Sequence, residues 1–176
     1  MPAKLTALST LTQLSKKLDK VCREYIYLRD DYTCRTCGIH KDATPLQQID
    51  CSHLISRKHF TTRWMQKNQI CQCRKCHMKY GDGFNLDMIK AIDGIWGEGT
   101  CELMEQINRE YPMIHTSNIG NKEFRVSLIN YYETLSNVIK NSGSPTIAQE
   151  CMDSEIALEG WGITLKSSQK ENTDGK

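Results

Sequence analysis

Two Cys-x-x-Cys pairs, Cys34-Arg-Thr-Cys37 and Cys73-Arg-Lys-Cys76, constrain this chain more than any other feature. Four thiolates are a common ligand set of structural zinc sites, and a tight CxxC turn points two sulfurs at one ion. The gap from Cys37 to Cys73 is longer than the roughly 15–20 residues of the common zinc-ribbon spacing. We therefore expect one zinc ion bound by all four cysteines, with a functional segment between the pairs. Cys71 is an alternative to Cys73, but its spacing to Cys76 is poorer.

Three other interpretations of the cysteine pairs remain open. One CxxC pair in a thioredoxin-like setting would be redox-active, although two pairs argue against this. Cys73 to His77 also spells CxxCH, the attachment motif of c-type haem, which requires an exported chain. The third alternative is a zinc module that binds DNA without cutting it.

The chain has 176 residues and nine cysteines. The stretch from Met1 to Leu18 lacks the compact apolar segment of a signal peptide, and no apolar run approaches the about 20 residues of a membrane span. We therefore expect a protein of the reducing cytoplasm with no membrane partner, in which a disulfide framework is not favoured. The cysteines outside the two pairs are then expected to be small buried side chains: Cys22, Cys51, Cys71, Cys101 and Cys151.

Charge is distributed unevenly along the chain. The net charge is only +2, but every charged residue between His53 and Gly81 is basic. A block of one sign beside a metal site favours a polyanionic partner such as nucleic acid. Phe60 and Trp64 lie within this block, where they either stack on bases or, as we favour, pack beneath the loop. The candidate phosphate-binding residues are Arg57, Lys58, Arg63, Lys67, Arg74 and Lys75.

Hydrophobic periodicity predicts helices over residues 9–30, 85–95, 100–111 and 121–140. Residues 48–54 have the character of a strand, and a further helix is expected to begin near Cys73–Cys76. The predicted organisation is an N-terminal helix in 1–31, a zinc-containing core in 32–83, a helical region in 84–140, and a linker with a disordered tail in 141–176. The fold class is therefore α+β, and the helix at 121–140 is the candidate interface of a homodimer.

Polar side chains gather between the cysteine pairs. In a strand over 48–54, Asp50 and His53 lie on opposite faces. His77 follows the last cysteine directly, so the zinc would fix its direction. Asn68 precedes Cys73 by five residues, where its amide could bond across the loop and orient His53.

The pattern CxxC … DxxH … N-x4-C-x2-C-H resembles the HNH, or ββα-metal, endonuclease superfamily. Within it, residues 34–83 are similar to phage recombination proteins of the NinG (Rap) type, and the resemblance extends loosely to about residue 111. Two departures are visible. Ser52 stands where many HNH proteins have aspartate, and His77 stands where NinG-like proteins often have asparagine.

The resemblance implies a zinc-stapled ββα-metal core with flanking helices, and a DNA endonuclease of a bacterial host cell. His53 would be the general base, Asn68 the structural asparagine, and Asp50 and His77 the ligands of a catalytic Mg²⁺ or Mn²⁺. The substrates it suggests are branched or single-stranded recombination intermediates. A non-catalytic zinc-containing DNA-binding protein is the alternative.

Overall fold

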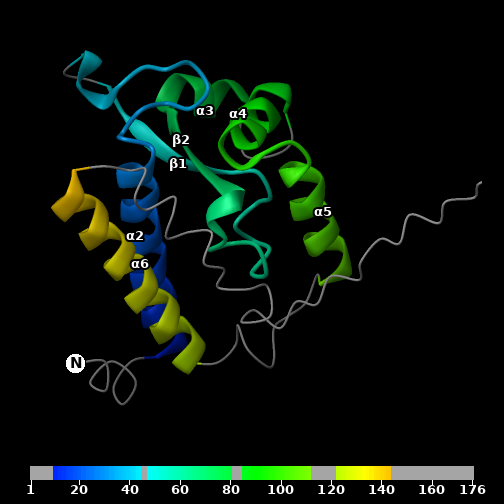
Figure 1. Cartoon of the computed structure of the whole chain (residues 1–176). Helices are drawn as coiled ribbons and strands as arrows, with labels where there is room; N and C mark the ends of the chain where they lie inside the picture. Colours follow the sequence, from blue (N-terminus) through cyan, green and yellow to red (C-terminus); the bar gives the residue numbers. More distant parts are fainter. Residues whose placement is uncertain (1–9, 45–46, 81–84, 112–121, 144–176) are drawn as a thin grey trace, which may run out of the picture.

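The structure is a computed structural model that describes residues 10–44, 47–80, 85–111 and 122–143 (Figure 1). In these residues several helices pack against a small antiparallel sheet of two strands, which confirms the α+β class. Within the described ranges, every helix is too short or too polar to span a bilayer. The predicted linker and tail lie outside the described residues from position 144 onward, as do residues 81–84.

Helix α2 (Leu11–Arg29) confirms the helix predicted over 9–30. Thr10 is its N-cap: the Thr10 hydroxyl accepts a hydrogen bond from the backbone N–H of Gln13, and the Gln13 side-chain oxygen accepts one from the backbone N–H of Thr10. This capping box satisfies two backbone donors at the helix start. The helix buries one apolar face, formed by Leu14, Leu18, Cys22, Tyr25 and Ile26.

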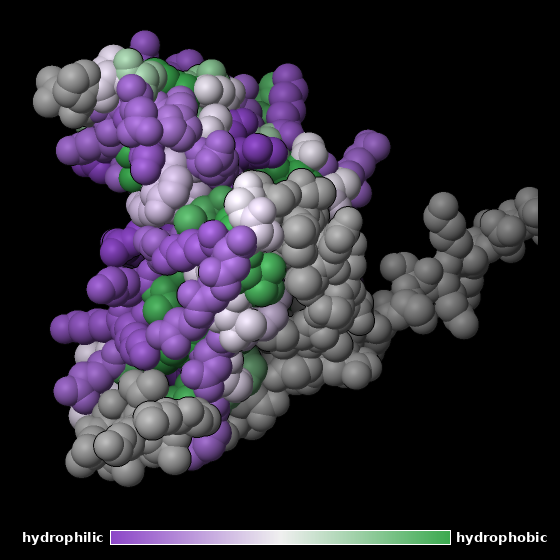
Figure 2. Space-filling view, turned by 60° about the vertical axis from the view of Figure 1, so that its left-hand side comes forward, coloured by the Kyte–Doolittle hydropathy of each residue, from purple (hydrophilic) through white to green (hydrophobic). Residues whose placement is uncertain are grey.

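Helix α6 (Lys122–Ser142) packs alongside α2 (Figure 1). The rings of Tyr25 and Tyr132 have centroids 5.3 Å apart, and Arg125 Nη1 donates a 2.8 Å hydrogen bond to the backbone oxygen of Leu11. On the side of these two helices, hydrophilic side chains cover much of the described surface (Figure 2). The apolar face of α6 therefore packs against α2 within the chain. The homodimer stays a prediction, and this face does not support it.

Strands β1 (Ile49–His53) and β2 (Gln69–Cys73) form the antiparallel sheet, with Cys51 opposite Cys71. The first strand confirms the strand predicted over 48–54. The second continues directly into helix α3 (Arg74–Tyr80). Both α2 and α3 contact the two strands. Short 3-10 helices, η1 (Lys41–Ala43) and η2 (Gln66–Asn68), lie in the connections on either side of β1.

Helices α4 (Leu86–Trp96) and α5 (Thr100–Glu110) confirm the predictions over 85–95 and 100–111. Gly97 and Gly99 separate them with φ values of 99° and 88°, a backbone region that side chains disfavour. Asn85 caps the first of the two helices, because its side chain accepts a hydrogen bond from the backbone N–H of Met88. The pair extends the apolar core with Met88, Ile92, Cys101, Met104 and Ile107.

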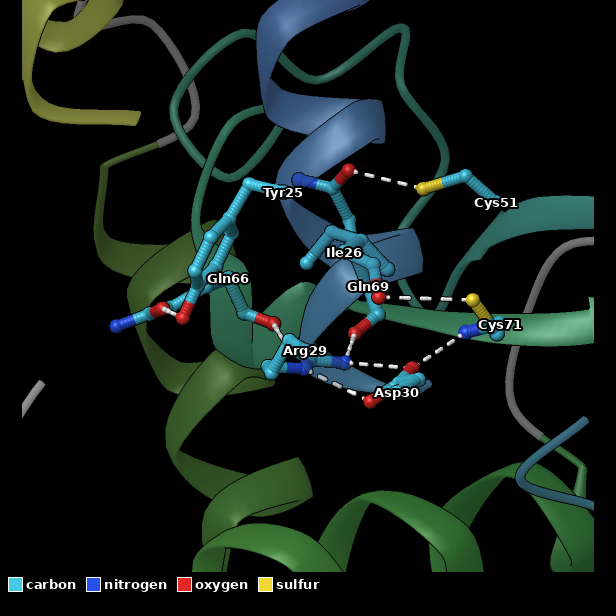
Figure 3. A network of polar contacts seen from close by, with 8 residues as sticks. All are labelled: Tyr25, Ile26, Arg29, Asp30, Cys51, Gln66, Gln69 and Cys71. Atoms are coloured by element: carbon cyan, nitrogen blue, oxygen red, sulfur yellow. Dashed lines mark hydrogen bonds and ion pairs between the residues drawn. The ribbon is translucent and has the colours of Figure 1, made fainter. Parts of the chain in front are cut away.

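A buried ion pair joins the end of α2 to β2 (Figure 3). Arg29 Nε lies 2.9 Å from Asp30 Oδ1, and the two side chains are only 1% and 2% exposed. Arg29 also donates to the backbone oxygens of Gln66 and Gln69, at 3.0 and 2.8 Å. Asp30 accepts a 2.7 Å hydrogen bond from the backbone N–H of Cys71. These bonds fix where β2, and therefore α3, begins relative to α2.

Candidate functional site

The sulfurs of Cys34, Cys37, Cys73 and Cys76 lie within 4.8 Å of one another, and the Sγ atoms of Cys37 and Cys73 are 3.7 Å apart. Tetrahedral coordination with Zn–S bonds of about 2.3 Å separates the sulfurs by about 3.8 Å. The four-cysteine cluster therefore has the dimensions of a structural metal site. This is the set of ligands that the CxxC spacing predicted.

The first cysteine pair sits in a tight turn. The backbone N–H of Cys34 donates a 2.9 Å hydrogen bond to the backbone oxygen of Ile39, and the backbone N–H of Gly38 donates a 2.8 Å hydrogen bond to the backbone oxygen of Cys34. Gly38 has a φ of 75°. The backbone N–H of Arg35 donates to the oxygen of Cys71 at 2.9 Å, which fastens this turn to β2. In the second pair, Cys73 ends β2 and Cys76 lies in the first turn of α3. Two distant segments thus meet at the cluster.

The cluster perturbs its own thiols. Burial favours the neutral form of Cys34, but hydrogen bonds from the backbone N–H groups of Cys73, Cys37 and Thr36 outweigh it and lower the pKa of Cys34. Burial, followed by the neighbouring sulfurs, raises the pKa of Cys76. Thiolates this close repel one another unless a cation lies between them, so the donor set suits a bound metal ion.

The other cysteines serve different purposes. Cys71, the alternative ligand, lies outside the cluster: its thiol donates a 3.5 Å hydrogen bond to the backbone oxygen of Ile26 (Figure 3). Cys22 and Cys101 are buried as expected, whereas Cys51 is only partly buried. Cys151 lies outside the described residues. Because each CxxC faces the other pair, the arrangement favours a shared metal over a redox centre.

Asp50 and His77 meet beside the cysteine cluster. His77 is the fourth residue of α3, and its Nδ1 lies 2.9 Å from Oδ2 of Asp50 in β1. Arg74 Nη1 lies 3.1 Å from the same carboxylate oxygen. Partial burial favours the neutral carboxyl, but the hydrogen bonds from His77 and Arg74 lower the pKa of Asp50. An ionised carboxylate and an imidazole therefore point at one another.

The distance between these two atoms permits a shared metal ion. Adjacent donors of an octahedral ion with bonds of about 2.1 Å are about 3.0 Å apart. The 2.9 Å separation of His77 Nδ1 and Asp50 Oδ2 matches this spacing. Carboxylate is a typical ligand of Mg²⁺ and Mn²⁺, whereas imidazole is more typical of transition-metal sites. The same 2.9 Å is a hydrogen-bond distance, so the catalytic ion stays a prediction of the HNH resemblance.

Asp50, His53 and His77 line one pocket of about 290 Å³. His53, at the end of β1, is only 9% exposed. Strand alternation was expected to place Asp50 and His53 on opposite faces, yet both border the pocket, which is also lined by residues of α2 and α3. The structure thus brings together the carboxylate and the two imidazoles from two parts of the sequence, β1 and α3.

Asn68 has a structural role that differs in detail from the predicted one. Its Oδ1 accepts a 2.7 Å hydrogen bond from the backbone N–H of Ile55, and its Nδ2 donates to the oxygens of Ile55 and Thr62, at 2.9 and 3.0 Å. The side chain is fully buried. Asn68 therefore fastens the loop that follows β1. Ile55, which Asn68 holds, lies two residues after His53, so Asn68 acts on His53 through this loop.

The predicted phosphate-binding residues divide into two groups. Arg57, Arg63 and Arg74 line the pocket, whereas Lys58, Lys67 and Lys75 are not among its lining residues. Arg63 is held by Asp19 of α2, with Nη2 and Oδ2 2.6 Å apart. An arginine in such a pair is less available to phosphate than expected.

Trp64 belongs to the core. It is 1% exposed, and its Nε1 donates a 2.8 Å hydrogen bond to Asp19. Phe60 packs edge-on against it with ring centroids 5.9 Å apart. The packing interpretation of these aromatic residues is therefore confirmed for Trp64, which is not free to stack on bases.

Sequence reasoning missed the contribution of α2 to the pocket. Asp19, Arg23 and Tyr27 line it, together with Gln69 of β2. Hydrophobic periodicity separated the buried and polar faces of α2 correctly, but it carries no information on which polar residues face the site. Gln69 was not predicted to line the pocket either, because its position there depends on the pairing of β2 with β1, in which Gln69 lies opposite His53.

The chain matches no protein-family model, no curated protein and no solved structure. The resemblance to HNH nucleases therefore rests on the sequence motif and stays a prediction. The structure itself shows a four-cysteine cluster and, separately, a pocket lined by the carboxylate–imidazole pair and a second imidazole.

Proposed function

We propose that this protein is a metal-dependent DNA endonuclease of the HNH type that hydrolyses phosphodiester bonds. The observation that carries the proposal is the pocket shared by Asp50, His53 and His77. General base catalysis and metal-assisted hydrolysis need an imidazole and a metal-binding pair around one phosphate. A non-catalytic module has no need to bring these three side chains together.

In this proposal Cys34, Cys37, Cys73 and Cys76 bind a structural Zn²⁺, which makes the sheet and α3 a ββα-metal core. The cluster joins the turn at Cys34–Cys37 to the start of α3. Because His77 immediately follows Cys76, the zinc fixes the first turn of α3 and thereby the direction of the His77 ring.

His53 acts as the general base. In its neutral form the imidazole can accept a proton from water. The water then attacks phosphorus in line with the leaving 3′-oxygen. Asp50 and His77 would hold Mg²⁺ or Mn²⁺, which when bound stabilises the negative charge that develops on the phosphate and leaving oxygen.

The arginines of the pocket favour a polyanionic substrate. Arg23, Arg57, Arg63 and Arg74 line it against two aspartates, Asp19 and Asp50, so the pocket carries excess positive charge. Contacts to backbone phosphates position DNA without reading its sequence, so binding should be salt-dependent and weakly specific. The branched or single-stranded recombination intermediates suggested by the resemblance are the substrates to compare with linear duplex.

The test is nicking of supercoiled plasmid by the full chain with Mg²⁺ or Mn²⁺. The wild type should produce open-circular DNA, and His53→Ala should lower the rate by about 10²–10⁴ while DNA binding is retained. His59→Ala is the matched control, because His59 is an exposed histidine of the loop after β1 and does not line the pocket. Intact plasmid with both metals, or full cutting by His53→Ala, would overturn the proposal.

One observation favours the alternative, a non-catalytic zinc-containing DNA-binding protein. The Asp50 carboxylate is already balanced by the charge of Arg74 and lies within hydrogen-bond distance of His77, so it does not require a metal ion for its charge. In that case the protein retards DNA in a gel with and without Mg²⁺, and the plasmid remains supercoiled. The nicking assay therefore separates the two functions.

A further inference from the structure

The arginines that line the pocket are not equivalent. Arg63 is paired with Asp19, with Nη2 and Oδ2 2.6 Å apart, and Arg74 is paired with Asp50 at 3.1 Å. Within the described part of the chain, Arg23 and Arg57 have no ion-pair partner, although both line the pocket. The excess positive charge of the pocket therefore resides on these two side chains.

Arg23 and Arg57 come from different parts of the fold. Arg23 is an exposed residue of α2, and Arg57 is an exposed residue of the loop after β1. Arg23 lies near enough to the sheet to act on it electrostatically: burial raises the pKa of Cys51 in β1, and Arg23 is one of the cations that oppose this rise. Arg23 has the same effect on Tyr27, which also lines the pocket.

We propose that Arg23 and Arg57 bind neighbouring phosphates of the DNA backbone at the candidate site, so that α2 forms part of the substrate-binding surface. This inference rests on the proposed nuclease function and extends it to a helix outside the cysteine-bounded segment. A guanidinium presents a planar fork of donors that matches phosphate oxygens. An arginine without an internal partner can offer this fork without first breaking an ion pair.

The two arginines are held by separate segments, α2 and the loop after β1, and share one pocket with His53. Arg23 depends on the packing of α2 against the sheet, which the buried ion pair of Arg29 and Asp30 maintains. Arg57 depends on the loop that Asn68 fastens. Substrate binding therefore depends on the Arg29–Asp30 ion pair and on Asn68, which position the pocket.

The test measures binding of a short fluorescent DNA duplex to the full chain over a series of salt concentrations, with no added divalent metal. Arg23→Ala should weaken binding roughly five- to tenfold and reduce the slope of log K against log salt by about 1. Arg57→Ala should do the same. Arg109→Ala, which removes an exposed arginine of α5 that does not line this pocket, is the matched control and should bind as the wild type does.

Arg23→Lys keeps the charge and should recover most of the salt slope but not the full affinity, because it lacks the fork of donors. Thermal unfolding and zinc content of each variant show whether the fold is retained. If the wild type binds and cuts DNA but Arg23→Ala and Arg109→Ala bind equally well, the inference about α2 is overturned and the nuclease proposal stands. If the wild type neither binds nor cuts DNA, both are overturned.

Discussion

The Nδ1 atom of His77 lies 2.9 Å from Oδ2 of Asp50, although the two residues are 27 positions apart in the sequence. Asp50 belongs to β1, and His77 stands directly after Cys76 at the start of α3. The carboxylate–imidazole pair and the four-cysteine cluster therefore share one short segment of backbone. Any change that releases the cluster should also separate Asp50 from His77.

Asp50→Asn should abolish the response of nicking to Mg²⁺ and Mn²⁺. The amide retains the shape of the side chain but loses the charge that attracts the ion, and metal assistance supplies several kcal/mol of transition-state stabilisation. The nicking rate at saturating DNA should therefore fall by on the order of 10² or more. Asp42→Asn, which changes an exposed aspartate far from the pocket, should cut at the wild-type rate. Equal metal dependence of the two variants would exclude Asp50 as a ligand.

The cysteine cluster predicts one tightly bound zinc ion per chain. The double variant Cys34→Ser, Cys76→Ser removes one ligand from each pair and should lose both the zinc and the folded core, because metal binding contributes directly to the stability of such small sites. Metal analysis and circular dichroism measure the two effects. As a control, Cys101→Ser alters a cysteine of α5 and should retain the zinc. A zinc-free wild type that is fully folded would contradict this prediction.

Asn68→Ala should destabilise the protein by about 1–3 kcal/mol, because it leaves buried backbone groups of Ile55 and Thr62 without their hydrogen-bond partner. The free energy of unfolding is obtained from urea denaturation with zinc present. Asn137→Ala removes an exposed amide of α6 and should change stability by less than about 0.5 kcal/mol. If Asn68→Ala were as stable as Asn137→Ala, the loop would not depend on Asn68.

Much of this arrangement was predictable from local sequence. The helices follow from hydrophobic periodicity, and the cysteine ligands follow from the CxxC spacing, because both signals depend on residues close together in the chain. The proximity of Asp50 to His77 followed from the resemblance to HNH nucleases. These features required no knowledge of how α2 or α6 packs.

The contributions that escaped prediction depend on distant segments. Arg63 carries a charge in a basic block, but its pairing with Asp19 arises only when α2 packs on the loop. Arg29 and Asp30 are adjacent charges at a helix end, a pattern that usually indicates solvent exposure, yet the fold buries both. The packing of Trp64 was predicted, but its hydrogen bond to Asp19 of α2 was not. Sequence alone does not specify these contacts.

Asp30→Ala should be among the most destabilising single substitutions in α2 and its cap. It leaves the guanidinium of Arg29 buried without its counter-charge and removes the acceptor of the Cys71 backbone N–H. Breaking one side of a buried ion pair costs about 3–5 kcal/mol. Asp42→Ala removes an exposed carboxylate and should cost less than about 1 kcal/mol. Urea denaturation compares the two, and similar stabilities would show that the Arg29–Asp30 pair does not hold β2 in place.

Cys22 should be chemically inert in the folded protein, although it lines the pocket. Burial raises the pKa of the Cys22 thiol to about 12. This effect exceeds the opposing effects of the hydrogen bond from Gln69 and of the charge of Arg29, which lower the pKa. The thiolate is the reactive form, and a raised pKa keeps the thiol protonated until the solution approaches that pH. An ordinary cysteine has a pKa of about 8.5, so alkylation of Cys22 near pH 8 should be slower by on the order of 10³ than in the unfolded chain.

Iodoacetamide labelling at several pH values, followed by mass spectrometry of the Cys22 peptide, measures this rate. In the native protein the rate should still be increasing above pH 10, whereas in denaturant it should level off above the ordinary cysteine pKa. The denatured chain is the matched control, since it contains the same peptide without its surroundings. Rapid native labelling near pH 8 would mean that the thiol is neither buried nor neutral. In that event the wall that α2 forms beside His53 would be open to solvent, and the shape of the candidate site would need revision.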